Sequence, residues 1–96
     1  EQVLGAVAAA FGVTTERLLG RDRSREVALP RQIAMYLLRQ EANTSLPQIG
    51  ETLGGRDHTT VMHACTKVAD LIERDDRLRR KVFSLREQIY GISSAV

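Results

Sequence analysis

Two consecutive glycines followed by a run of polar side chains constrain this chain more than any other feature. Gly54-Gly55 ends one amphipathic segment, because glycine adopts backbone angles that residues with a Cβ atom adopt reluctantly. Asp57 is a good N-cap for a following helix, since its carboxylate can accept from the unpaired N–H groups of the first turn. The next three residues are polar too, which is rare at a buried helix start: His58, Thr59 and Thr60. This stretch predicts a helix tip that enters a DNA major groove and faces base edges.

The segment before the glycines predicts the first helix of a helix-turn-helix. Residues 45–48, Ser-Leu-Pro-Gln, have the capping-box pattern, with Ser at the N-cap, Gln at N3 and Pro in the first turn. After Asp57, apolar residues recur at helical spacing as far as Ile72. A short helix, a tight glycine turn and a longer helix with a polar tip form the helix-turn-helix pattern, which we expect over about residues 45–74.

The rest of the chain also has helical periodicity. At 96 residues, with 43% hydrophobic and 4% aromatic residues, the sequence predicts one all-α domain, a small helical bundle. A basic loop is expected over about residues 20–26, which hold no apolar side chain, and Pro30 fits the first turn of the next helix. A C-terminal helix is expected over about residues 76–92, with a stripe of Leu78, Val82, Leu85, Ile89 and Ile92. We favour a break before it at Asp75 or Asp76, although acid-before-base pairs across this point also fit one continuous helix.

Positive charge is concentrated in two stretches, although the whole chain carries only +2. Residues 17–31 hold five arginines against Asp22 and Glu26, and residues 77–86 hold five basic residues and no acid. Such uneven charge favours a polyanionic partner, although solvated helix faces often have the same composition. In the loop, an arginine such as Arg23 suits insertion into a narrow A·T-rich minor groove, whereas the two acids would repel a nearby phosphate. Most of the second stretch fits a solvated surface.

Residue types that could support other chemistry lack its spacing. His58 and His63 are five apart, about 140° around a helix, and cannot share a metal ion on one face. The glycines of residues 50–55 are not followed by the Gly-Lys-Ser/Thr of a phosphate loop. Cys65 is the only cysteine, fits a core position, and indicates a reducing cytoplasm rather than a disulfide framework. We expect no catalytic residue, no metal site and no cofactor in this chain.

Several further expectations concern the chain as a whole. No apolar run approaches the ~20 residues of a membrane span, and no signal peptide is evident. The chain begins with Glu1 rather than Met, so we expect it to be a piece of a longer protein. Met35, Tyr36 and Met62 lie at helical spacing beside core positions and are expected to pack there.

Three stretches together, residues 23–32, 45–50 and 54–65, closely resemble the C-terminal DNA-binding domain of DnaA, the bacterial chromosomal replication initiator. The most specific of them contains Gly55-Arg56-Asp57-His58-Thr59-Thr60-Val61. The resemblance implies a Trp-repressor-like helix-turn-helix domain that binds double-stranded DNA at the DnaA boxes of the origin. It also implies an ATP-binding AAA+ domain upstream of this chain, a monomeric isolated domain in the bacterial cytoplasm at the nucleoid, and contacts with other initiator copies through absent domains.

The same resemblance assigns roles to individual residues. Base contacts are implied for Arg23 in the minor groove, for Leu46 and Pro47 at thymine methyl groups, and for Asp57, His58 and Thr59 in the major groove. Phosphate contacts are implied for Arg25, Arg31, Gln32, Ser45, Thr60, His63 and Lys67. Asp22, Glu26 and Leu29 depart from the family pattern, and we expect these changes to weaken the phosphate contacts without altering base readout.

Two other functions remain open from the residues alone. One is a helical protein-interaction module whose surface is the basic stretch at residues 77–86. The other is the recognition domain of a transposase or transcription factor, which would use the same groove contacts on another sequence.

Overall fold

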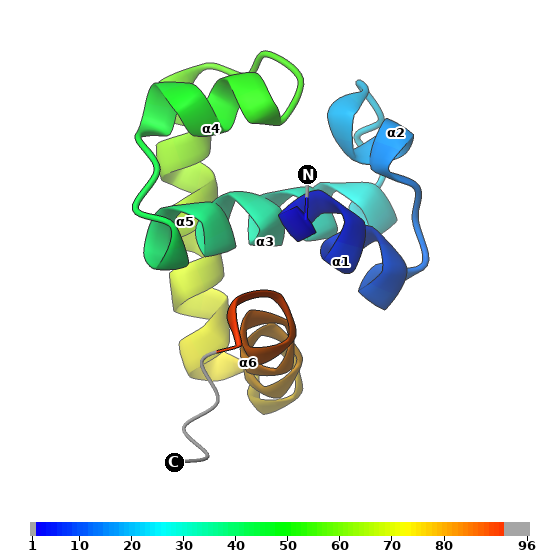
Figure 1. Cartoon of the computed structure of the whole chain (residues 1–96), viewed down its shortest axis with the longest axis vertical. Helices are drawn as coiled ribbons and strands as arrows, with labels where there is room; N and C mark the ends of the chain where they lie inside the picture. The colour runs from blue at the N-terminus through cyan, green and yellow to red at the C-terminus, as the bar shows by residue number, and fades with distance from the viewer. Residues whose placement is uncertain (1, 92–96) are drawn as a thin grey trace.

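The computed structural model describes residues 2–91, which fold into six helices. They are α1 (Gln2–Phe11), α2 (Thr15–Leu19), α3 (Arg25–Glu41), α4 (Leu46–Thr52), α5 (His58–Arg74) and α6 (Asp76–Tyr90). Helix α3 crosses the middle of the molecule and packs on α5 and α1 (Figure 1). Helices α2 and α4 lie near one end of the long axis, and α6 lies near the other (Figure 1). The predicted all-helical class is confirmed for the described part of the chain.

One apolar core joins these helices. Every helix contributes at least one buried apolar side chain, and those that are completely enclosed include Val7, Leu18, Val27, Ile33, Leu37, Ile49, Val61, Val68 and Val82. Each aliphatic side chain of this kind stabilises the fold by roughly 1.5–3 kcal/mol relative to an exposed position. Helix α3 packs on both α1 and α5, so it joins the helix-turn-helix to the N-terminal helices.

The predicted break between the last two helices is confirmed. Asp75 ends α5, because its backbone is extended, with φ −120° and ψ 104°, although its N–H still donates to the Leu71 carbonyl at 2.8 Å. The same residue is the N-cap of α6, since its carboxylate accepts from the Leu78 N–H at 3.0 Å. Asp76 then pairs with Arg79 and Arg80 on the first turn of α6. Helix α6 ends at Tyr90, and Ile92 lies outside the described residues.

The predicted boundary of the basic loop is wrong at its C-terminal side. Helix α3 begins at Arg25, so the loop covers only residues 20–24, and Pro30 lies in the second turn of the helix rather than in the first. Val27 and Pro30 are both buried, and they extend the apolar stripe of α3 towards its N-terminus. Proline has no backbone N–H, so the Glu26 carbonyl lacks the helical hydrogen bond that residue 30 would otherwise donate. Glu26 is exposed, and the free energy gained by burying Val27 and Pro30 exceeds the cost of this missing bond.

The helix-turn-helix has a close backbone contact at Gly50. The N–H groups of Gly55 and Arg56 donate to the Gly50 carbonyl at 2.9 and 2.8 Å, so the turn folds back on α4. A Cβ atom at Gly50 would lie 2.0 Å from the Arg56 carbonyl oxygen. Gly54 adopts a φ of +89°, as expected of a glycine turn. Only a residue without a side chain at position 50 allows this approach.

We predict that Gly50→Ala destabilises the domain by about 1–3 kcal/mol, because the added methyl group forces α4 away from the turn. Gly5 on α1 is the matched control: it is helical, and a Cβ atom there meets nothing within 4 Å. Gly5→Ala is expected to stabilise the domain by about 0.5–1 kcal/mol. Urea denaturation of both variants measures the difference. Equal effects of the two substitutions would contradict the close contact.

Candidate nucleic-acid interface

The N-terminal tip of α5 is exposed over all four of its polar residues, Asp57, His58, Thr59 and Thr60. Asp57 is the predicted N-cap, since its carboxylate accepts from the Thr59 N–H at 3.0 Å. This backbone hydrogen bond holds the pKa of the Asp57 carboxyl below its usual value. The side chains of Asp57 and His58 remain 65% and 61% exposed, so both are accessible to a ligand. The protein's own packing does not cover the tip.

The start of α4 also has the predicted capping box. The Ser45 hydroxyl accepts from the Gln48 N–H at 3.3 Å, and the Gln48 side-chain oxygen accepts from the Ser45 N–H at 3.4 Å. Pro47 is exposed, whereas Leu46 is half-buried against the core. The capping box fixes the direction of α4, so these two apolar residues have a defined place on the surface.

The basic loop places Arg23 and Ser24 in solvent and is shaped by Asp22. Asp22 pairs with Arg17 at 2.7 Å and accepts from the Ser24 N–H at 2.8 Å. The hydrogen bond from Arg17 is the main reason that the pKa of Asp22 lies well below its usual range. Arg17 also pairs with Glu26 at 3.4 Å. The two acids expected to repel phosphates are therefore compensated by a neighbouring cation.

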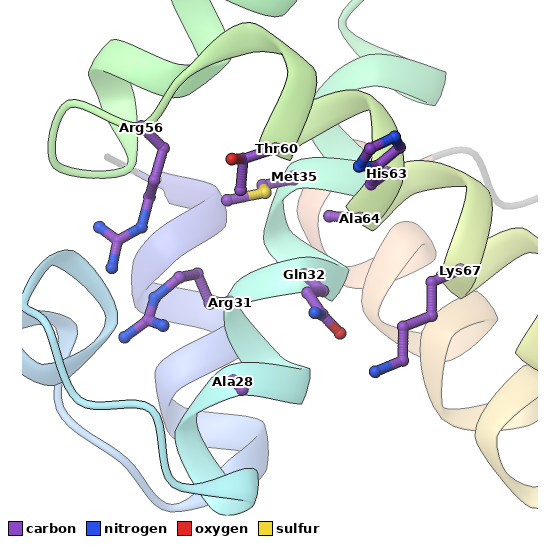
Figure 2. A pocket seen from close by; sticks show the side chains of 9 residues that line it. All are labelled: Ala28, Arg31, Gln32, Met35, Arg56, Thr60, His63, Ala64 and Lys67. Carbon is purple, nitrogen blue, oxygen red and sulfur yellow. The ribbon is translucent and has the colours of Figure 1, made fainter.

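Five of the predicted phosphate-contacting residues line one hollow between α3 and α5. The hollow has a volume of about 270 Å³, and these residues are Arg31, Gln32, Thr60, His63 and Lys67 (Figure 2). Figure 2 shows the Gln32 and Lys67 side chains extending towards the same part of it. The Gln32 side-chain oxygen is buried and has no hydrogen-bond partner among the described residues. The Gln32 side-chain N–H2 group and the Lys67 ammonium group are donors that can bind an anionic oxygen, whereas the unpartnered amide oxygen requires a donor.

A second hollow brings the loop next to the helix-turn-helix. Its volume is about 690 Å³, and it is lined by residues 19–21 and Arg23 on one side and by the turn at residues 54–56 on the other. Four arginines line it and no acidic residue does: Arg21, Arg23, Arg31 and Arg56. Thr60 lines both hollows, so the loop, the turn and the tip of α5 share one continuous face.

Arg31 is buried, with only 8% of its surface exposed. Its Nε donates to the Leu18 carbonyl at 2.7 Å, and its Nη2 donates to the carbonyls of Arg17 at 3.0 Å and Asp22 at 2.9 Å. Burial lowers the pKa of this guanidinium from its ordinary value. Arg31 thus holds the end of α2 and the start of the loop. The phosphate contact implied for it stays a prediction.

Arg56, like Arg21, is an arginine of this face to which the sequence analysis assigned no individual role. It lies between Gly55 and the N-cap Asp57, and its guanidinium donates to the carbonyls of Leu19, at 3.1 Å, and of Gly20 and Leu53. Two of these acceptors are more than 30 residues away in the chain, so no local pattern reveals them. The one available signal was an arginine inside a tight turn that otherwise consists of small residues.

Arg25, Tyr36, Met62 and Cys65 do not line either hollow, whereas Met35 lines the first. Arg25 is exposed on the first turn of α3, and Met62 is 45% exposed, so the expectation that Met62 packs in the core is wrong. Met35 is buried and Tyr36 and Cys65 are half-buried beside the core, as expected. In residues 2–91, no three His, Cys, Asp or Glu side chains cluster closely enough to hold a metal ion. No helix within that range is long and apolar enough to cross a membrane.

The basic stretch on α6 makes contacts within the protein. Lys81 lies 4.2 Å from the centroid of the Phe11 ring, and Arg86 pairs with Glu41 at 3.3 Å. Arg79 and Arg80 pair with Asp76. Helix α6 lies near the end of the molecule opposite α4 (Figure 1), and most of its cations have partners on their own chain.

Comparison with known proteins identifies relatives over the whole chain. The family model for the bacterial dnaA protein helix-turn-helix matches residues 1–68. The chain is 53% identical over 89 residues to the chromosomal replication initiator protein DnaA of Chloroflexus aurantiacus, which covers 93% of this chain and 19% of that protein. It is 51% identical over 96 residues to the protein of the same name from Roseiflexus castenholzii, covering all of this chain and 20% of the relative. The chain spans about a fifth of the length of the curated relatives it matches.

We predict that Asp57→Ala lowers the melting temperature by roughly 3–10 °C, because the first turn of α5 loses its cap. Asp57→Asn keeps an oxygen acceptor and is expected to leave the melting temperature nearly unchanged. Thermal unfolding followed by circular dichroism measures both. If the two variants unfold at the same temperature, the carboxylate does not stabilise α5 as a cap.

The same cap should depend on pH in a defined direction. The pKa of Asp57 is lower in the folded protein than in the unfolded chain, where it is about 3.9. The cap therefore contributes fully to the free energy of unfolding above that pH, and the contribution is lost as the pH falls through the pKa of the folded protein. The difference in melting temperature between the native protein and Asp57→Ala should therefore be constant near pH 7 and should shrink below about pH 4. A difference that grows on acidification would contradict the hydrogen bond to the Thr59 N–H.

Proposed function

The chain belongs to the bacterial DnaA helix-turn-helix family, and from this premise we propose that it binds double-stranded DNA sequence-specifically at the DnaA boxes of a replication origin. It acts as the DNA-binding domain of a chromosomal replication initiator, in the bacterial cytoplasm. It carries out no reaction itself, and ATP binding and contacts between initiator copies belong to other parts of the longer protein. The single observation that carries this proposal is the shared face formed by the exposed tip of α5 and the arginine-lined loop.

Base readout follows from the chemistry of the exposed groups. Asp57 accepts from a cytosine amino group, and His58 donates to or accepts from a base edge. The Thr59 methyl group contacts a thymine methyl group, as do exposed Pro47 and half-buried Leu46 at the start of α4. Arg23 enters the adjacent minor groove, where a narrow A·T-rich sequence concentrates negative potential.

Phosphate contacts hold the domain in register without reading sequence. The hollow between α3 and α5 offers an amide, an ammonium, a hydroxyl and an imidazole, from Gln32, Lys67, Thr60 and His63. We propose that a backbone phosphate lies there and accepts from the Gln32 side-chain N–H2 group and from the Lys67 ammonium group. Ser45 and Arg25 are exposed at the N-termini of α4 and α3, where helix dipoles add to phosphate attraction.

The two rival functions have less support. A protein-interaction module would need free cations on α6, whereas most of those in residues 77–86 are paired within the chain. A transposase or transcription factor would use the same groove contacts, but the relatives matched over the whole chain are named as replication initiators. The isolated domain is proposed to bind as a monomer.

We predict that this chain binds a duplex containing a DnaA box about 10³-fold or more tightly than a scrambled duplex of the same length. The logarithm of the affinity for either duplex should fall linearly with the logarithm of salt concentration, by about 0.9 per phosphate neutralised. Fluorescence anisotropy across a salt series measures both quantities. Equal affinities for the two duplexes would refute sequence-specific binding, and a flat salt dependence would refute phosphate anchoring.

A second prediction separates the two grooves. Thr59→Ala is expected to cost about 1–3 kcal/mol on the cognate box and to relax discrimination at the base pair it faces. Arg23→Ala should weaken binding most where the minor-groove edge is A·T-rich, and replacing that edge with G·C pairs should remove its penalty. Ser84→Ala and Arg77→Ala, both exposed on α6, are the controls matched for size and charge. Uniform losses on every duplex would instead indicate that neither residue contributes to sequence readout.

A further inference from the structure

We propose that Arg56 is a positioning residue that fixes the basic loop relative to the tip of α5, and thereby sets the spacing between minor-groove and major-groove contacts. This inference rests on the proposed function, because that spacing matters only for a DNA ligand. It concerns one of the two arginines on the shared face, Arg21 and Arg56, to which the family resemblance assigns no role.

The argument begins with the partners of the Arg56 guanidinium. Nη1 donates to the Leu19 carbonyl at 3.1 Å and to the Leu53 carbonyl, and Nη2 donates to the Gly20 carbonyl. Leu53 ends the α4 side of the turn, while Leu19 and Gly20 end α2 and begin the loop. One planar group therefore joins two segments that are 36 and 37 residues apart along the chain. Lysine has a single nitrogen and cannot reproduce this arrangement.

Arg31, on α3, also holds the end of α2 and the start of the loop. It donates to the Leu18 and Arg17 carbonyls of α2 and to the Asp22 carbonyl within the loop. Figure 2 shows both guanidiniums extending towards the same side of the hollow, where the α2–α3 connection lies. Together the two arginines bond carbonyls from residue 17 to residue 22, and Arg23 follows directly. The position of Arg23 relative to α5 is thus set by Arg31 through α3 and by Arg56 through the turn.

The environment of Arg56 favours this role over a direct phosphate contact. Its guanidinium is partly buried, and burial, followed by the charges of Arg31 and Arg21, lowers its pKa. Its donors already bond carbonyls at the C-terminal end of α2, where the helix dipole is negative. A group engaged in this way orients the loop rather than reaching out to DNA.

Gly54 supports the same geometry independently. A Cβ atom there would lie 2.2 Å from the Leu19 carbonyl oxygen and 2.7 Å from the Arg56 Nη1. The turn and the end of α2 therefore approach so closely that no side chain fits between them. The contact between loop and helix-turn-helix consists of backbone on one side and backbone with a guanidinium on the other.

A double-mutant cycle on DNA tests the coupling. In the native background, Arg23→Ala should weaken binding to a box with an A·T-rich minor-groove edge by roughly tenfold. In an Arg56→Met background the same change should cost less than about twofold, because the loop no longer holds Arg23 over the groove. Discrimination at the base pair facing Thr59 should persist in Arg56→Met. Equal penalties of Arg23→Ala in both backgrounds would overturn the proposal, as they are expected of an independent phosphate contact. Arg77→Met on α6 is the control matched for charge.

A measurement without DNA keeps the inference separate from the proposed function. Spin labels at Ser24→Cys in the loop and Ala69→Cys on α5, in a Cys65→Ser background, report the distance between these elements. Ser24 and Ala69 are both exposed, so a label can be attached at either position. The distance distribution should be narrow in the native protein and in Arg77→Met, and broad or shifted in Arg56→Met.

Arg56→Lys should give a distance distribution of intermediate width. This variant keeps the test possible if Arg56→Met fails to fold. An unchanged distribution in folded Arg56→Met or Arg56→Lys would refute positioning whatever the DNA results. Failure of the proposed function appears differently, as equal binding of the native protein to a box and a scrambled duplex.

Discussion

The close approach of two backbone segments at Gly50 is the constraint on which the rest of the interface depends. The Gly50 carbonyl accepts from two N–H groups of the turn, and the missing side chain lets the Arg56 carbonyl lie against α4. This contact fixes the angle at which α5 leaves the turn. It also directs the Arg56 side chain towards the end of α2. One glycine therefore determines both the direction of the exposed helix tip and the attachment of the loop beside it.

Features that depend on residues close in sequence could be predicted from the sequence. The caps at Ser45, Asp57 and Asp75 each bond an N–H two or three residues ahead, so a short pattern identified the helix starts. The start of α3 could not be found in this way. Its first residues are charged and its N-cap Ser24 makes no side-chain cap hydrogen bond, so no short pattern marks the helix start before the buried Val27. The helical stripe extends through the proline because tertiary packing outweighs one missing donor.

The arginine–carbonyl bonds that organise the candidate interface could not be predicted from sequence patterns, for a different reason. Arg31 and Arg56 bond carbonyl oxygens, and every residue has a carbonyl, so no residue type in the acceptor segment reveals the partner. The charge pattern was informative only in part. It indicated a basic loop before α3, although the loop ends at residue 24 and not at residue 26, and the neighbouring acids Asp22 and Glu26 are paired with Arg17. The basic stretch on α6 is mostly paired within the chain.

The use of carbonyl acceptors has a consequence for how the domain behaves when it leaves a polyanion. A guanidinium keeps its proton throughout the physiological range, and its bonds to neutral amide dipoles are little affected by dissolved ions. Rising ionic strength should therefore weaken the proposed attraction between this face and phosphates, while the bonds from Arg31 and Arg56 to carbonyl oxygens persist. A domain that dissociates at high salt should therefore keep the loop and the tip of α5 in the arrangement proposed for binding. Rebinding then requires diffusion and the displacement of counterions, with no refolding of the surface.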